Sequence, residues 1–93
     1  QMSDIICRSI TISGKVQGVF FRHHTKTEAD KLQINGFVRN EPDGTVFILA
    51  EGKSSQIKIF IEWCHRGSPN AVVESVKVNK VSKQGFTEFL ILR

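Results

Sequence analysis

A glycine-bounded loop carries residue types that can bind an anion. The segment Gly14–Val19 follows an apolar stretch and leads into a helical pattern that begins at Phe21 or Arg22. Unpaired main-chain N–H groups and the positive end of the helix dipole favour an anion there. Gly14 and Gly18 permit conformations that aim several amides inward, and the Arg22 guanidinium can hold two oxygens of one phosphate. The segment can be a phosphate cradle or a plain strand-to-helix connection with a surface arginine, and the residue types leave both open.

The kind of anion is narrowed by what the loop lacks. No G-K-[ST] follows four spacer residues, so the loop suits a lone phosphoryl group better than a nucleoside triphosphate. Thirteen Lys and Arg residues against nine Asp and Glu give a formal net charge of +4. This charge suits an anionic partner but does not decide between nucleic acid and a phosphorylated small molecule.

Asn40 is the second candidate for chemistry, near the end of a predicted strand and just before a turn. A carboxamide both donates and accepts hydrogen bonds and does not titrate, so it can orient a water molecule at any ordinary pH. Asparagine is also frequent before turns for conformational reasons alone. Both interpretations of Asn40 remain open on its residue type.

Hydrophobic periodicity predicts the elements that must position these residues. Strands are expected over residues 5–13, 37–40, 45–51, 71–81 and 86–92, with one helix from 21 or 22 to 33 and a second that has Ser54 as N-cap and ends at Gly67. Asn35 and Gly36 are expected to stop the first helix, and the apolar run 46–50 predicts a central strand. The order is βαββαβ plus a final strand. It predicts an α+β, ferredoxin-like sandwich with two helices on one face of an antiparallel sheet.

Length and composition bound the rest. The 93 residues are expected to form one domain, 1–93. Residues 1–4 are expected to lie outside the ordered fold, and Gln1, which precedes Met2, is expected to be foreign to the natural chain. No apolar stretch approaches the roughly 20 residues of a membrane span, and no secretory pattern opens the chain, so a cytoplasmic location is expected. Cys7 and Cys64 have no metal or disulfide spacing and are expected to be small core residues.

Two segments together resemble the acylphosphatase family. The first is G-K-V-Q-G-V-F-F-R at Gly14–Arg22, and the second is G-F-V-R-N-E-P-D-G-T-V at Gly36–Val46. The element order and a last strand with Phe89 and Ile91 extend the resemblance over nearly the whole chain. It implies an enzyme, an acylphosphatase, that hydrolyses acyl phosphates to a carboxylate and inorganic phosphate.

The resemblance also implies the site residues. The family's phosphate cradle corresponds to the amides of Gln17, Gly18, Val19, Phe20, Phe21 and Arg22. Its essential arginine corresponds to Arg22 and its water-holding asparagine to Asn40. No metal, cofactor or phosphoenzyme is implied, and the expected partner is a small acyl phosphate bound by a monomer, without nucleic acid or membrane. Because a carboxylate leaves without needing a proton, no general acid is required.

Departures from the family pattern are small. Phe37 stands where tryptophan is common and is expected to preserve packing, and strand alternation is expected to turn Glu41 away from the face of Asn40. His23 and His24, adjacent on a helix, point about 100° apart, so at most one faces the site. Surface roles are expected for both and for His65, and core packing for Trp63.

Two other classes remain as alternatives. An RRM-type RNA-binding domain shares the length and architecture, but its aromatic pattern belongs on the third strand, where this chain offers only Phe47. A non-catalytic module that merely binds a phosphorylated ligand is the other alternative. The joint presence of Arg22 and Asn40 argues against such a module without excluding it.

Overall fold

The computed structural model describes residues 4–93, and its elements follow the predicted order. They are β1 (Ile5–Lys15), α1 (Phe21–Lys31), β2 (Asn35–Asn40), β3 (Val46–Lys53), α2 (Ser54–Arg66), β4 (Val72–Val81) and β5 (Phe89–Ile91). Residues 1–4 were expected to lie outside the ordered fold, and the first three of them are outside the described residues. Asp4 is described and lies in a short turn next to β1.

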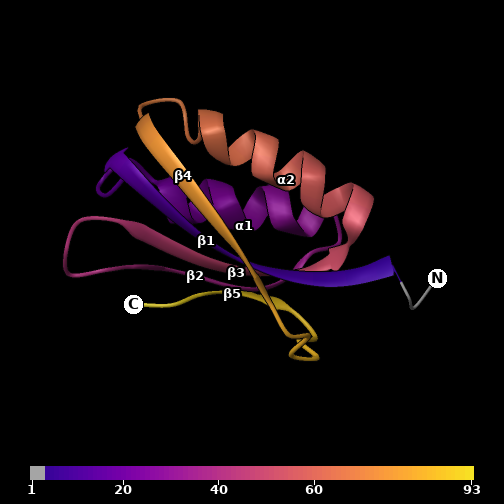
Figure 1. Ribbon diagram of the computed structural model, residues 1–93. Helices are drawn as coiled ribbons and strands as arrows, with labels where there is room; N and C mark the ends of the chain where they lie inside the picture. Colours follow the sequence, from indigo (N-terminus) through magenta and orange to yellow (C-terminus); the bar gives the residue numbers. More distant parts are fainter. Residues whose placement is uncertain (1–3) are drawn as a thin grey trace.

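The strands form one sheet in the order β4-β1-β3-β2-β5, and Figure 1 shows both helices on the same face of it. The predicted central strand is confirmed, because β3 lies in the middle. The pairs β1–β3, β1–β4 and β2–β3 are antiparallel. The short β5 runs parallel to β2, so the sheet is mixed at this edge and not antiparallel throughout. The ferredoxin-like sandwich is otherwise as predicted.

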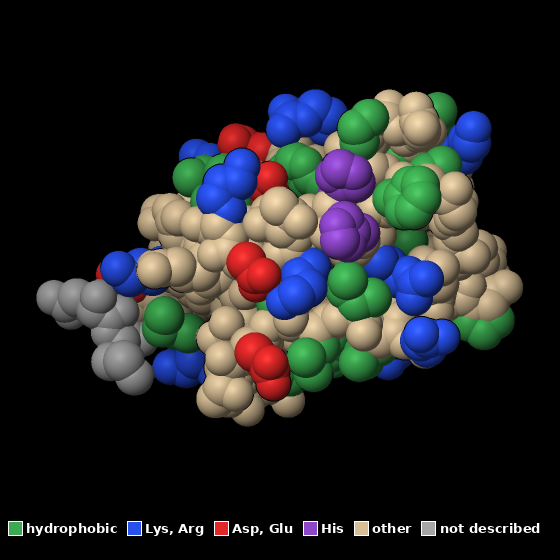
Figure 2. Space-filling view, turned by 180° about the vertical axis from the view of Figure 1, so that it is seen from behind, with side chains coloured by type: hydrophobic (Ala, Val, Ile, Leu, Met, Phe, Trp, Pro, Cys, Tyr) green, Lys and Arg blue, Asp and Glu red, His purple; other side chains and the backbone are tan. Residues whose placement is uncertain are grey.

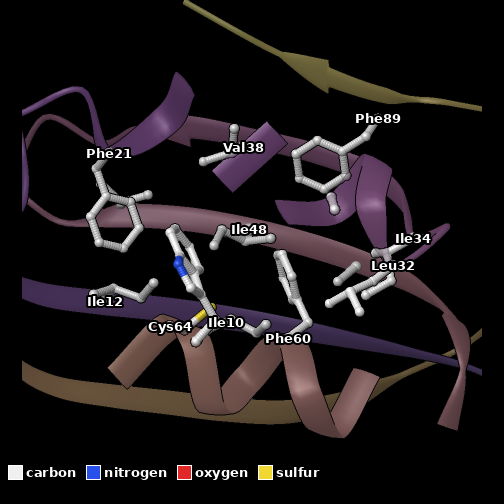
Figure 3. Packing of buried hydrophobic residues seen from close by; sticks show 14 of the residues in the cluster. Ile10, Ile12, Phe21, Leu32, Ile34, Val38, Ile48, Phe60, Cys64 and Phe89 are labelled. Carbon is white, nitrogen blue, oxygen red and sulfur yellow. The ribbon is translucent and has the colours of Figure 1, made fainter. Parts of the chain in front are cut away.

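The core lies between the helices and the covered face of the sheet (Figure 3). Phe60 and Trp63 of α2 stack with ring centroids 6.3 Å apart, and Phe60 meets Phe89 of β5 at the same distance. Trp63 also packs against Phe21 at the start of α1, with centroids 5.5 Å apart. The core role predicted for Trp63 is confirmed, and this aromatic row fixes the first turn of α1 over the sheet.

Two helix ends differ from the sequence prediction. The first helix ends at Lys31, earlier than predicted, because Gln33 takes a left-handed conformation with φ 59°. The N–H of Ile34 then donates to the carbonyl of Ala29, which closes the last turn. At the second helix, Ser54 is the first helical residue and not the N-cap; Lys53 holds that place without a side-chain capping bond.

The first strand runs two residues further than predicted, to Lys15, through a bulge at Ser13 and Gly14. Gly14 has φ 123°, and a Cβ there would lie 2.2 Å from the carbonyl oxygen of Val72. Gly14 is therefore needed for close pairing of β1 with β4. The prediction that it belongs to the anion-binding loop is wrong, since strand pairing and not loop geometry explains this glycine.

Both cysteines are free and buried, as predicted. Cys64 is a fully buried member of the hydrophobic cluster, whereas Cys7 belongs to β1 and pairs with Glu51 of β3. Burial raises the pKa of the Cys64 thiol far above its ordinary value, with a smaller contribution from Glu28. The thiol of Cys64 thus stays neutral in the native protein.

This burial predicts a pH dependence of stability. Above pH ~8.5 the unfolded chain loses the Cys64 proton while the native chain keeps it, so the free energy of unfolding falls as the pH rises, by at most about 1.4 kcal/mol per pH unit. Denaturant titrations at pH 8, 9 and 10 measure this slope. In Cys64→Ala, less stable at every pH, the slope is expected to be shallower; equal slopes would contradict the assignment.

Candidate active site

A pocket of about 390 Å³ lies where the loop after β1 meets the ends of β2 and β5. It brings together Arg22, in the first turn of α1, and Asn40, at the far end of the next element, β2. Four of the six predicted phosphate-binding residues line it: Gly18, Phe20, Phe21 and Arg22. The full lining is Val16, Gly18, Phe20, Phe21, Arg22, His23, Asn40 and Ile91.

The loop backbone turns through left-handed conformations just before α1. Gly18 has φ 75° and Phe20, the N-cap of the helix, has φ 60°. The N–H of His24 donates to the carbonyl of Phe20 at 3.1 Å, as a helical i to i−4 bond. The amides of the first turn, from Phe21 to His23, precede this bond, and no side chain caps them. This arrangement leaves main-chain donors at the pocket for an anion.

The other two predicted cradle residues hold the loop in place through contacts that sequence reasoning missed. Gln17 Nε2 donates to the carbonyl oxygens of Glu41 at 2.8 Å and Thr45 at 2.9 Å, which joins the loop to the β2–β3 turn. The Val19 side chain is buried, and its carbonyl accepts a bond from Ser68 Oγ at 2.8 Å. No spacing in the sequence links these partners, because they lie 24, 28 and 49 residues apart along the chain.

Arg22 lies in the first turn of α1, with its guanidinium partly buried at the pocket. Its Nη1 donates to the carbonyl of Leu92, just beyond β5, at 2.8 Å. One helical turn further on, Lys26 Nζ donates to the carbonyl of Phe89 and pairs with Asp30 at 3.1 Å. Since a guanidinium has five N–H donors, the contact with Leu92 orients Arg22 and leaves donors for a phosphoryl group.

Asn40 is the last residue of β2 and pairs with Val46. Its Oδ1 is buried without a hydrogen-bond partner and is the only such side-chain atom among residues 4–93. Buried polar atoms in native proteins are nearly always paired, so each exception needs a reason. An acceptor buried in the pocket that contains Arg22 suits a donor that arrives with the substrate, such as a water molecule.

The neighbours of Asn40 are directed to the opposite side of the sheet. Arg39 Nε is paired with the Glu41 carboxylate, and the guanidinium lies over the rings of Phe37 and Phe47, 5.4 and 5.0 Å from their centroids. Glu41 turns away from Asn40, as expected, and Phe37 packs against Phe47 and Phe86 with ring centroids 6.0 and 6.1 Å apart. No carboxylate therefore opposes an anion from this position.

The two histidines diverge, as their adjacency on the helix predicts. His23 is exposed and lines the active-site pocket, whereas the half-buried His24 lines a separate hollow beside Trp63. Figure 2 shows two histidine side chains next to each other on one face of the molecule, with apolar and Lys or Arg side chains nearby. His23 thus lies on the surface, as expected, at the rim of the active-site pocket. His65, on α2, is also exposed.

Within the described part of the chain, no three or more His, Cys, Asp or Glu side chains are grouped as metal ligands. Among the helices of residues 4–93, none has both the length and the apolar character needed to cross a membrane.

Comparison with known proteins places this architecture. The acylphosphatase family matches residues 8–91. A protein of Acaryochloris marina named acylphosphatase is 47% identical over 92 residues, covering 99% of each chain. The structure of an acylphosphatase from Coxiella burnetii superposes with a TM-score of 0.95 at 35% identity, covering 99% of this chain and 97% of that one. The acylphosphatase of Bacillus subtilis gives 0.92 at 38% identity, over 95% and 99%.

The fold together with these matches defines a small α+β hydrolase domain. The chain belongs to the acylphosphatase family, whose members are hydrolases acting on acid anhydrides. The family assignment and the activity that the resemblance implied are confirmed. The two alternatives, an RNA-binding domain and a non-catalytic phosphate-binding module, are not favoured.

The bridge made by Gln17 gives a test of how the site is positioned. Gln17→Glu puts a carboxylate opposite two carbonyl oxygens, which is expected to release the loop, lower kcat/KM for an acyl phosphate about ten- to a hundredfold and lower the free energy of unfolding by about 1–3 kcal/mol. Gln33→Glu, an exposed change of the same type, is the control. Full activity of Gln17→Glu would show that the bridge does not position the site.

Proposed function

We propose that the chain hydrolyses acyl phosphates in this pocket by in-line attack of water on phosphorus. The main-chain amides from Gln17 to Arg22 and the Arg22 guanidinium bind the phosphoryl oxygens, and Asn40 orients the water. The observation that carries the proposal is the buried Oδ1 of Asn40, an acceptor without a partner in the pocket that Arg22 lines.

The chemistry matches the groups in the pocket. The water oxygen forms a bond to phosphorus while the bond from phosphorus to the acyl oxygen breaks, and the electron pair leaves with the carboxylate. One water hydrogen is donated to Asn40 Oδ1, which fixes the direction of attack. The other proton passes to a phosphoryl oxygen, so no side chain needs to act as general base. Negative charge that gathers on the phosphoryl oxygens is stabilised by Arg22 and the loop amides.

The finer features of the activity are part of the same proposal. The substrate is a small molecule, and the chain acts as a monomer without metal, nucleic acid or membrane. What supports a cytoplasmic location is that Cys7 and Cys64 are free thiols, which is usual in a reducing compartment.

Turnover in the presence of a chelator tests the activity and its independence of metal. The purified chain is expected to release benzoate and phosphate from benzoyl phosphate at the same rate with and without excess EDTA. The spontaneous hydrolysis rate in the same buffer is the baseline. A rate at that baseline would refute the activity, and loss of activity on chelation would refute the metal-independent route.

The division of roles between Arg22 and Asn40 is tested by substitution. Arg22→Ala is expected to weaken competitive inhibition by inorganic phosphate and to lower kcat, because the guanidinium binds the phosphoryl oxygens in the ground state and binds them more strongly as negative charge gathers on them in the transition state. Asn40→Ala is expected to lower kcat about 10²–10³-fold with phosphate affinity largely kept, because it removes only the contact to water.

The controls are the exposed residues Arg66 and Asn79, each replaced by alanine. Thermal unfolding of every variant separates lost activity from lost folding, which matters for Arg22 because it also contacts Leu92. An equal loss of phosphate affinity in Arg22→Ala and Asn40→Ala would contradict the assigned roles.

A further inference from the structure

The active-site pocket is larger than a phosphoryl group and one water molecule require. A water molecule occupies about 30 Å³ of liquid volume, so a phosphoryl group and one water fill only part of the 390 Å³. The rest of the pocket is bounded by side chains that the hydrolysis itself does not use. Among these are Phe20 and Ile91, which approach from different parts of the chain.

Phe20 keeps a large apolar ring in solvent at the mouth of the pocket. The residue is 76% exposed, and its φ of 60° is in a region that residues other than glycine rarely occupy. Exposure of the ring and a left-handed backbone are both unfavourable in the free protein. Strained backbone conformations concentrate at functional sites, and Phe20 lines the pocket, so its ring is a candidate for contact with a ligand.

Ile91 contributes a second apolar side chain to the pocket lining from the end of β5 and is 38% exposed. The bond from Arg22 to the carbonyl of the next residue, Leu92, fixes this end of β5 beside the first turn of α1. The polar part of the pocket, with Arg22 and Asn40, therefore continues into an apolar mouth. An acyl phosphate with an apolar acyl group changes in the same way along its length, from a charged phosphoryl end to an apolar acyl end.

We propose that Phe20 and Ile91 bind the acyl group and select acyl phosphates with a bulky apolar acyl part, aromatic or branched, over acetyl phosphate. This inference rests on the proposed function, since it requires the phosphoryl group to lie against Arg22. Neither side chain touches the reacting atoms, so both determine specificity and not the chemical step. An apolar acyl group covers the Phe20 ring and the Ile91 side chain, and removal of this surface from water favours the complex.

The experiment compares kcat/KM for benzoyl phosphate and acetyl phosphate in the same preparations. Ile91→Ala is expected to lower kcat/KM for benzoyl phosphate about fivefold, the effect of losing one or two buried methylene contacts, and to leave that for acetyl phosphate close to the wild-type value. Phe20→Gly keeps the backbone conformation and removes the ring. Its ratio of the two kcat/KM values is expected to fall by about tenfold relative to wild type.

Leu90→Ala is the matched control. Leu90 is 45% exposed, it neighbours Ile91 on the same strand, and strand alternation turns it to the other face of the sheet. It is expected to leave the ratio unchanged. A binding readout without turnover is inhibition by benzylphosphonate and methylphosphonate, where Ile91→Ala is expected to weaken only benzylphosphonate.

The outcomes separate this inference from the function on which it rests. If wild type hydrolyses both substrates and the ratio is unchanged in Ile91→Ala and Phe20→Gly, the acyl-binding role is wrong and the proposed function stands. If the ratio falls equally in Leu90→Ala, the effect is structural and the role is also wrong. If wild type hydrolyses neither substrate above the spontaneous rate, the proposed function itself has failed.

Discussion

The left-handed backbone at Phe20 is the constraint on which the site depends. It ends the loop and starts α1 without a side-chain cap, so the N–H groups of the first helical turn remain available as hydrogen-bond donors at the pocket. A conformation of this kind costs a non-glycine residue about 1 kcal/mol or more and persists only when its surroundings enforce it. The loop is held on both sides, by the hydrogen bonds of its own Gln17 to the β2–β3 turn and by Ser68 from beyond α2.

The sheet supplies the second half of the site. Alternation along β2 turns Asn40 toward the helices, while Arg39 and Glu41 pair with each other on the open face. A shift of one residue in the pairing of β2 with β3 would reverse these directions and remove the carboxamide from the pocket. Gly67 contributes to the same geometry, because a Cβ there would lie 2.5 Å from the ring of Phe21, which packs at the start of α1.

Local patterns were enough to predict much of this arrangement. The order of elements, the central position of residues 46–50 and the burial of Cys64 and Trp63 follow from hydrophobic periodicity, and the motifs indicated Arg22 and Asn40. The sequence could not show which glycine serves the loop, since the need for Gly14 arises from the close approach of β4. It also could not reveal the Gln17 bridge or the left-handed Gln33, because both depend on partners that only the folded chain supplies.

The most direct test of the account is a crystal structure of the chain with phosphate or sulfate. The account predicts an anion held by the loop amides between Gln17 and Arg22 and by the Arg22 guanidinium. It also predicts an ordered water that donates a hydrogen bond to Asn40 Oδ1 and lies in line with one bond of the anion. An empty loop at saturating anion, or an Asn40 Oδ1 already paired with a protein donor, would contradict it.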